Sequence, residues 1–176
     1  VNLSASTVDE DAANTSYVFT ATLSAASQGD TIIVTDKGTI EIADGETTGT
    51  LTIASNNTGD VYNDASELTA TITSASGGNF EKINVGTATA KATVTDTDTP
   101  ETVNVSAETV NEDAIDTSYV FTATLSAASQ GVTTIVTDKG TITIADGQTT
   151  GTLTIASNNT SDVYVDRSEL TATITS

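Results

Sequence analysis

The sequence predicts an all-β protein, and two observations carry this prediction. Side chains alternate with a period of two in segments such as 17–23 (YVFTATL) and 68–73 (LTATIT), which is the pattern of half-buried strands with threonine on the outer face. Turn-forming sequences separate these segments at short intervals. No stretch shows the 3.6-residue period of an amphipathic helix.

Seven strands are predicted in the first hundred residues. The turn Asp36-Lys37-Gly38 joins the third strand to the fourth, Asp44-Gly45 ends the fourth, and Gly77-Gly78 follows the sixth. The predicted strands cover residues 2–8, 15–23, 31–35, 39–43, 48–54, 67–74 and 85–95. Seven short strands in about 100 residues are typical of an immunoglobulin-like β-sandwich. Aromatic residues are only 4% of the chain, so small side chains must fill much of the core and stability without a ligand is expected to be marginal.

The chain repeats itself with an offset of 102 residues. The segment SYVFTATLSAAS at 16–27 returns unchanged at 118–129, and about 12 of the 74 paired positions differ. Such a period matches one small domain per copy rather than a solenoid unit. We therefore expect a first β-sandwich at 1–99, a short linker at 100–102 and a second, incomplete sandwich at 103–176.

The second copy has no counterpart of residues 75–99, which include the predicted last strand. A sandwich without that strand would expose an unpaired sheet edge. We expect either that the natural protein continues beyond Ser176 or that a neighbouring molecule supplies the strand, and we favour the first interpretation.

Composition and charge exclude several classes of function. The formal net charge is −19, from 24 acidic residues against five lysines and arginines, so nucleic acids and anionic membranes are not expected partners, whereas cations are. The absence of Cys excludes disulfides and thiolate metal sites, and the absence of His removes the usual general base, so we expect no enzyme. No apolar run approaches the ~20 residues that a membrane-spanning helix needs.

Acidic residues are predicted to converge at one end of the first domain. If successive strands alternate in direction, this end holds the loop after the first strand, the turn at 36–38, the segment 55–66 and the end of the last strand. The acids there are Asp9, Glu10, Asp11, Asp60, Asp64, Glu67, Asp96 and Asp98, with Lys37 as the main positive charge nearby. Carboxylate, amide and carbonyl oxygens from three segments suit Ca²⁺ better than the tighter octahedron of Mg²⁺. The alternative is that the acids lie in ordinary solvated turns.

The same residues carry a resemblance to a known family. Val8-Asp9-Glu10, the sequence Asp60-Val61-Tyr62 followed by Glu67, and the terminal VTDTD at 94–98 resemble Calx-beta repeats and the related extender modules of giant bacterial surface adhesins. These adhesins include the biofilm adhesins that carry repeats-in-toxin (RTX) sequences. The resemblance implies a seven-stranded sandwich with calcium at the domain end or junction. It covers the first copy and all of the second copy that is present.

The predicted calcium ligands follow from this convergence together with the resemblance. They are Glu10, Asp11, Asp60, Asp64, Glu67, Asp96 and Asp98 in the first copy, and Glu112, Asp162, Asp166 and Glu169 in the second. The spacing from Tyr62 to Glu67 is one residue longer than in Calx-beta repeats, which leaves the choice between Asp64 and Glu67 open. The second copy has no counterparts of Asp96 and Asp98. The chain also has no Gly-Gly-x-Gly-x-Asp nonapeptide, so it is not expected to form a calcium-binding β-roll.

These observations favour a structural extender of an extracellular adhesin on a bacterial cell surface. Calcium would stiffen the junctions between adjacent repeats of the chain and hold a distal binding domain away from the cell. One alternative is a module that binds glycan or ice directly. The Thr-x-Thr runs would suit an ice-binding face, although strand propensity explains them more simply, and Tyr62 and Tyr164 are the aromatic residues outside predicted core positions that a sugar-binding face would use. Another is a subunit of a surface layer or filament, in which the open sheet edge accepts a strand from a neighbouring copy.

Overall fold

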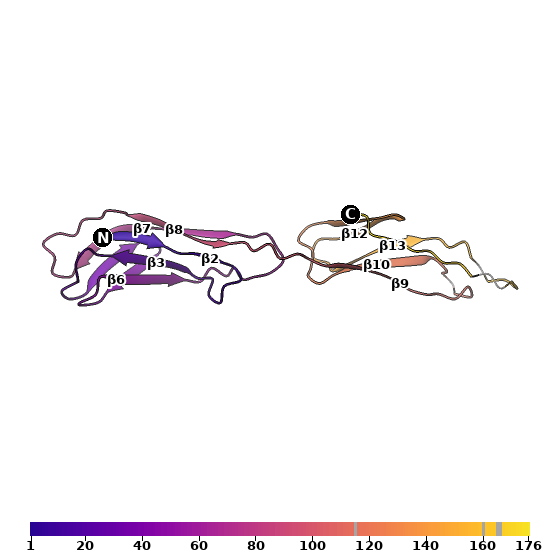
Figure 1. Cartoon of the computed structure of the whole chain (residues 1–176), viewed down its shortest axis with the longest axis horizontal. Coiled ribbons are helices and arrows are strands. Elements are labelled where there is room, and N and C mark those ends of the chain that lie inside the picture. The colour runs from indigo at the N-terminus through magenta and orange to yellow at the C-terminus, as the bar shows by residue number, and fades with distance from the viewer. Residues whose placement is uncertain (115, 160, 165–166) are drawn as a thin grey trace. The chain divides into compact units, whose positions relative to one another are not determined.

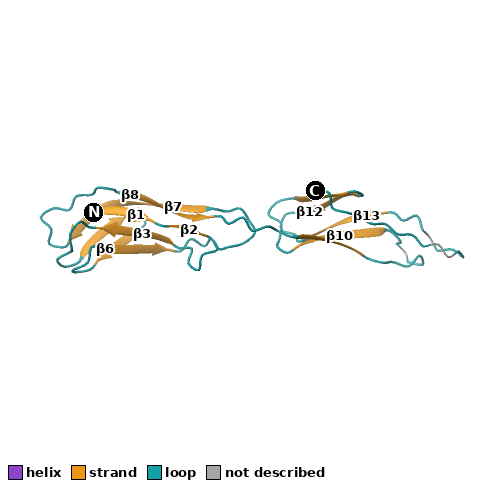
Figure 2. Ribbon diagram, viewed as in Figure 1, coloured by secondary structure: helices purple, strands orange, loops and turns teal. Residues whose placement is uncertain are grey.

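The regular secondary structure of the described residues consists of β-strands, as the sequence predicts. The computed structural model describes residues 1–114, 116–159, 161–164 and 167–176, and no helix occurs among them (Figure 2). None of these residues therefore belongs to a helix that could cross a membrane. The chain divides into two compact units, Val1–Thr99 and Pro100–Ser176 (Figure 1).

Unit 1 is a sandwich of two sheets (Figure 1). One sheet has the order β1-β3-β6, with β1 at Asn2–Ala5, β3 at Tyr17–Thr22 and β6 at Thr48–Ile53. The other has the order β2-β8-β7-β4-β5, with β2 at Thr7–Asp9, β8 at Thr89–Thr95, β7 at Ser66–Gly77, β4 at Thr31–Thr35 and β5 at Gly38–Ile42. Every second residue of these strands faces inward, so Phe19, Ile33 and Ile40 are fully buried between the sheets.

The predicted first strand at 2–8 is divided, so unit 1 has eight strands rather than seven. Strand β1 pairs antiparallel with β3, whereas β2 pairs parallel with β8. Ser6 makes the crossing: its N–H donates to Val18 O at 3.0 Å in the first sheet, and its carbonyl accepts from Thr93 N at 3.1 Å in the second. The crossing carries the chain beyond Asp9 alongside the end of β8.

Unit 2 repeats part of this arrangement. One sheet has the order β13-β10-β9, with β9 at Val103–Ala107, β10 at Tyr119–Leu125 and β13 at Thr150–Ile155. The other pairs β11 at Thr133–Thr137 with β12 at Gly140–Ile144. The counterpart of β7 makes only an isolated bridge, Thr137 to Ile174. In unit 1 the corresponding strand β7 pairs with both β4 and β8.

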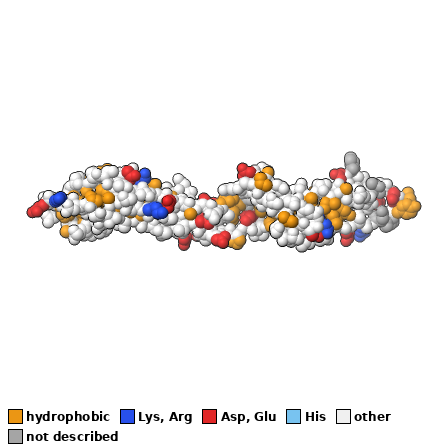
Figure 3. Space-filling view, turned by 90° about the horizontal axis from the view of Figure 1, so that it is seen from above, with side chains coloured by type: hydrophobic (Ala, Val, Ile, Leu, Met, Phe, Trp, Pro, Cys, Tyr) orange, Lys and Arg blue, Asp and Glu red, His pale blue; other side chains and the backbone are white. Residues whose placement is uncertain are grey.

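The surface reflects the composition of the chain. On the face shown in Figure 3, acidic side chains outnumber basic ones, and most of the area is neither charged nor hydrophobic. Two of the few lysines of unit 1 form exposed ion pairs, Lys37 with Asp36 at 3.1 Å and Lys91 with Glu67 at 2.6 Å. Such exposed pairs contribute less than about 1 kcal/mol each to stability.

Candidate metal site

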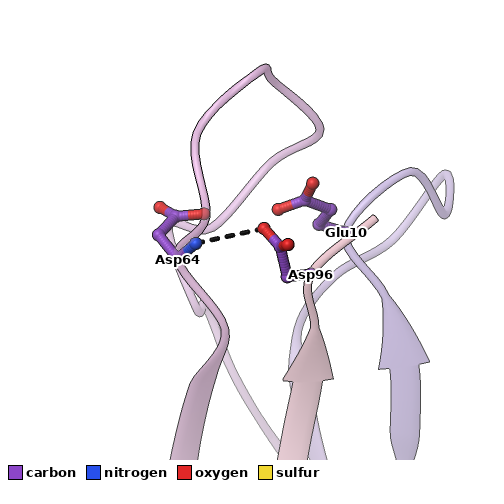
Figure 4. Close-up of side chains that lie close together, drawn as sticks. All are labelled: Glu10, Asp64 and Asp96. Atoms are coloured by element: carbon purple, nitrogen blue, oxygen red, sulfur yellow. Dashed lines mark hydrogen bonds between the residues drawn. The ribbon is translucent and has the colours of Figure 1, made fainter. Parts of the chain in front are cut away.

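Three chain segments meet at one end of unit 1. The backbone N–H of Glu10, which directly follows β2, donates to Thr95 O at 3.0 Å and so extends the β2–β8 ladder by one bond. The carbonyl of Glu10 accepts from Gly59 N at 3.0 Å, which attaches the loop between β6 and β7. In the same loop, Asp64 N donates to Asp96 Oδ1 at 3.1 Å (Figure 4). These hydrogen bonds fix the backbone positions from which the side chains of Glu10, Asp64 and Asp96 extend.

The carboxylates of Glu10, Asp64 and Asp96 share one small space. Each offers an oxygen that lies within 4.8 Å of the chosen oxygens of the other two. Figure 4 shows Glu10 above the start of its loop, Asp96 at the end of β8, and Asp64 across from both. Glu10 is buried, with only 1% of its surface exposed, whereas Asp96 is half-buried and Asp64 is exposed. The group is therefore open to solvent on the Asp64 side.

The two oxygens of Glu10 have different surroundings. Oε1 accepts a hydrogen bond from Thr97 N at 3.1 Å. Oε2 is buried and has no hydrogen-bond partner among the described residues. Buried polar atoms are nearly always paired, because leaving one without a partner costs the full desolvation of that atom. An unpaired carboxylate oxygen beside two further carboxylates lacks a positively charged partner.

The acids around Glu10 change its ionisation. The N–H of Thr97 lowers the pKa of Glu10, but burial and the negative charges of Asp96, Asp64 and Asp60 act in the opposite sense. Their sum outweighs the hydrogen bond, so the net pKa of Glu10 is raised above its usual value of 4.5. The charged form of Glu10 is thus less favoured than that of an ordinary exposed glutamate.

Asn57 gives the loop between β6 and β7 its shape. It is 5% exposed, and its Nδ2 donates to Asp64 O at 2.5 Å and to Ser66 Oγ at 3.2 Å. The preceding residue, Asn56, has a φ of 59°, a left-handed conformation that asparagine tolerates better than most residues. The role of Asn57 cannot be predicted from the sequence, because the pair Asn56-Asn57 does not reveal which amide points inward.

The other predicted ligands of the first copy lie outside the three-residue group. Asp60 Oδ1 accepts from Tyr62 N at 2.7 Å and closes a local turn. Glu67 is exposed and forms the ion pair with Lys91 described above. Asp98 is exposed, and Asp11 is exposed beside Gly59, where a Cβ would clash with Asp11 Oδ1.

The turn between β4 and β5 does not reach this end of the unit, contrary to the sequence prediction. Asp36 N donates to Thr71 O at 3.0 Å, and Thr71 N donates to Asp36 Oδ1 at 2.7 Å. Thr71 lies five residues along β7 from Ser66, which is about 17 Å at the rise of a strand. The prediction failed because β4 is short and pairs only with the far half of β7. Lys37 consequently neutralises Asp36 and not the group around Glu10.

Unit 2 does not form the same group among its described residues. Glu112, the counterpart of Glu10, is half-buried, and Asp162 accepts from Tyr164 N at 2.7 Å in the same turn that Asp60 makes. Glu169 is exposed, and the predicted ligand Asp166 lies outside the described residues. The given sequence of the second copy contains no counterpart of Asp96 and Thr97.

The group in unit 1 fits a calcium ion by its donors and its spacing. Calcium takes oxygen ligands at 2.3–2.6 Å, so two ligands of one ion can lie up to about 5.2 Å apart. The oxygens of the group all lie within 4.8 Å of one another, which is inside this range. Glu10, Asp64 and Asp96 could hold such an ion, with water completing its coordination on the open side.

Comparison with known proteins gives one match. A family model described as the LapA domain matches residues 1–97 and again residues 98–176, so the two matches together cover the whole chain. No curated protein and no solved structure matches the chain.

Proposed function

Because the chain belongs to the LapA domain family, a family of domains from large biofilm adhesins, we propose that it is a structural extender of such an adhesin at the bacterial cell surface, with calcium stiffening its junctions. The all-β fold and the absence of His and Cys agree with a structural rather than an enzymatic role. Two nearly identical sandwich units in sequence are what an extender requires, since each added repeat adds length without a new fold.

The observation that carries the calcium part of the proposal is the unpaired Oε2 of Glu10. A carboxylate that is 1% exposed, next to two further acids and without a basic partner for its second oxygen, is unfavourable in the metal-free protein. A hard divalent cation removes this cost and also offsets the repulsion between Glu10, Asp64 and Asp96. The bound ion would thereby stabilise unit 1.

The same ion would act on the segment that leaves unit 1. Asp96 directly follows β8, and Thr97 donates its N–H to Glu10. Holding Asp96 to Glu10 and Asp64 would therefore fix the chain as far as Thr97, three residues before Pro100. Pro100 itself has a fixed φ and restricts Thr99 to extended conformations. In calcium-rich surroundings the exit of unit 1 would be stiff, and without calcium it would be loose. This mechanism is the one that the resemblance to Calx-beta repeats implies.

Isothermal titration calorimetry with CaCl₂ tests the metal site directly. We expect one calcium site per chain, in unit 1. Its Kd should lie in the range of about 10⁻⁴–10⁻³ M that is usual for extracellular calcium modules, and Mg²⁺ should bind more weakly. A chain in which Glu10 is changed to Gln should lose this binding, while Glu112→Gln serves as the matched control in the second copy. Equal binding by the Glu10→Gln chain would rule out this site.

Small-angle X-ray scattering tests the extender role separately. We expect calcium to narrow the distribution of end-to-end distances of the two-unit chain, and EDTA to broaden it again. Calcium binding without any such change would leave the metal site in place and reject stiffening of the junction.

A further inference from the structure

An acidic residue precedes the first strand of unit 2 on the inner side of that strand. Strand β9 begins at Val103, and the alternate residues Val103 and Val105 pack against the core of unit 2. Glu101 lies two residues before Val103, so it continues this alternation, and it is half-buried rather than exposed. A carboxylate in such a place needs hydrogen-bond donors close by, because part of its hydration is lost.

Ser126, which directly follows β10, supplies these donors. Its N–H donates to Glu101 Oε1 at 2.6 Å, and its hydroxyl oxygen lies 2.9 Å from both Oε1 and Oε2. Both carboxylate oxygens of Glu101 therefore have a partner, unlike those of Glu10. The last backbone pair between β9 and β10 is Val103 with Leu125, so the carboxylate extends the pairing of these two strands beyond its regular end.

The surroundings of Glu101 favour its charged form. The N–H and the hydroxyl of Ser126 hold the pKa of Glu101 below its usual value of 4.5. The backbone N–H groups of Ala127 and Thr102 act on this pKa in the same sense, and burial opposes them. Hydrogen bonds to an ionised group are roughly twice as strong as those between neutral groups. The contact therefore needs no cation, in contrast to the acidic group of unit 1.

We propose that Glu101 anchors the start of unit 2 to the end of β10 without a metal, and thereby limits the flexible part of the linker to residues 98–100. On the side of unit 1 the backbone is held as far as Thr97, whose N–H donates to Glu10. Within 98–100, Pro100 has a fixed φ and restricts the residue before it. The anchor itself does not depend on calcium, whereas the benefit of a short flexible segment to an extender rests on the proposed function.

NMR relaxation of the whole ¹⁵N-labelled chain tests the anchor without any substitution. In EDTA we expect backbone order parameters of about 0.85 at Glu101 and Thr102, as in rigid backbone, and below about 0.6 at Asp98 and Thr99. Equal order parameters at the four positions, whether high or low, would overturn the proposal. The measurement is made without calcium, so its outcome does not depend on the metal site.

Replacing Glu101 by Ala tests the contact itself. We expect the amide hydrogen of Ser126 to exchange at least about tenfold faster, because this N–H loses a charged acceptor. The order parameter of Thr102 should fall below about 0.6. The control is Glu108→Ala, which removes an exposed acid that directly follows β9 and should change the exchange rate of Ser126 by less than about twofold. Amides of unit 1 should keep their exchange rates and serve as an internal reference.

Ser126→Ala gives the matching test from the donor side. It removes the hydroxyl but keeps the N–H, so Thr102 should become more mobile than in the unchanged chain and less mobile than in the Glu101→Ala chain. The same change at the exposed counterpart in unit 1, Ser24→Ala, should leave Thr102 unaffected.

Small-angle X-ray scattering separates the anchor from the metal site. Glu101→Ala should broaden the distribution of end-to-end distances both in EDTA and in calcium, whereas loss of the metal site should act in calcium alone. The proposal is overturned if Thr102 is as rigid in the Glu101→Ala chain as in the unchanged chain, or if the amide of Ser126 exchanges at the same rate in both.

Discussion

Replacing Glu10 by Gln separates the cost of the buried charge from the benefit of a bound ion. Glutamine keeps an oxygen that can accept from Thr97 N but removes the negative charge that faces Asp64 and Asp96. In EDTA the variant should therefore melt at the same temperature as the unchanged chain or higher, because the charge it removes is unfavourable without a cation. Adding calcium should not raise the melting temperature of the variant. Relative to the unchanged chain, the variant should therefore melt no lower in EDTA but lower in calcium, which is the behaviour expected when a metal ligand is removed.

The size of the calcium effect follows from the kind of site. A Kd of about 10⁻⁴–10⁻³ M, at 10 mM calcium, places the ion at roughly 10 to 100 times its Kd. Binding to the folded state alone then contributes about 1.4–2.7 kcal/mol to the free energy of unfolding. For a unit of the size of Val1–Thr99, each kcal/mol raises the melting temperature by about 4–8 °C. We expect a rise of about 6–22 °C for unit 1 of the unchanged chain.

Calorimetry in EDTA and in 10 mM calcium measures both effects, and hydrogen exchange of the β8 amides assigns the shift to unit 1. The control is Glu112→Gln, which makes the same change where no counterpart of Asp96 follows. The control chain should keep the full calcium-dependent rise. A Glu10→Gln chain that still melts higher in calcium, or that is strongly destabilised in EDTA, would contradict the reasoning.

Three further predictions follow from the geometry. Asp96→Asn should weaken calcium binding by about tenfold or more in calorimetric titration, whereas Asp98→Asn, outside the group, should change it by less than about threefold. Without calcium, protonation of Glu10 should help to raise the melting temperature of unit 1 as the pH falls from 7 towards 4.5, because its pKa is raised in the folded state and protonation removes the buried charge. The Glu10→Gln chain should not show this part of the pH dependence. In denaturant unfolding, Gly49→Ala should cost more than about 2 kcal/mol, because a Cβ there would overlap a backbone carbonyl of β5, whereas Gly45→Ala, strained only by its φ of 82°, should cost about 1–2 kcal/mol.

The strands could be predicted from the sequence because their alternation is local. The prediction of a strand at 31–35 coincides with β4, and that at 48–54 differs from β6 by one residue. The predicted strand at 85–95 begins only at Thr89, because Gly86 N donates to Val1 O and Thr87 O accepts from Leu3 N near the start of β1. The division of the first strand at Ser6 was missed for a similar reason. Alternation along one strand does not reveal which sheet each residue joins.

The candidate site could be predicted only in outline. Loop positions alone bring the ends of β2 and β8 and the loop before β7 to one end of unit 1, and Glu10, Asp64 and Asp96 come from these three segments. The sequence left Asp64 and Glu67 as alternatives. The structure places Asp64 in the group, because Glu67 lies on β7 itself and reaches diagonally to Lys91 on the neighbouring strand. Such competition between partners depends on cross-strand register, which the spacing of acids along the chain does not contain.

Comparison of the two units shows what determines the site. Glu10 and Glu112 lie in nearly the same sequence, yet Glu10 is 1% exposed and Glu112 is half-buried. The difference coincides with β8: in unit 1 the residue after β2 bonds to Thr95, and Thr97 donates to the carboxylate. The strand that closes the second sheet therefore also buries the acid and supplies Asp96 to it. If this group holds calcium as we propose, the ordering of β8 and the binding of the ion would favour the same state of unit 1, so each would stabilise the other by an equal free energy.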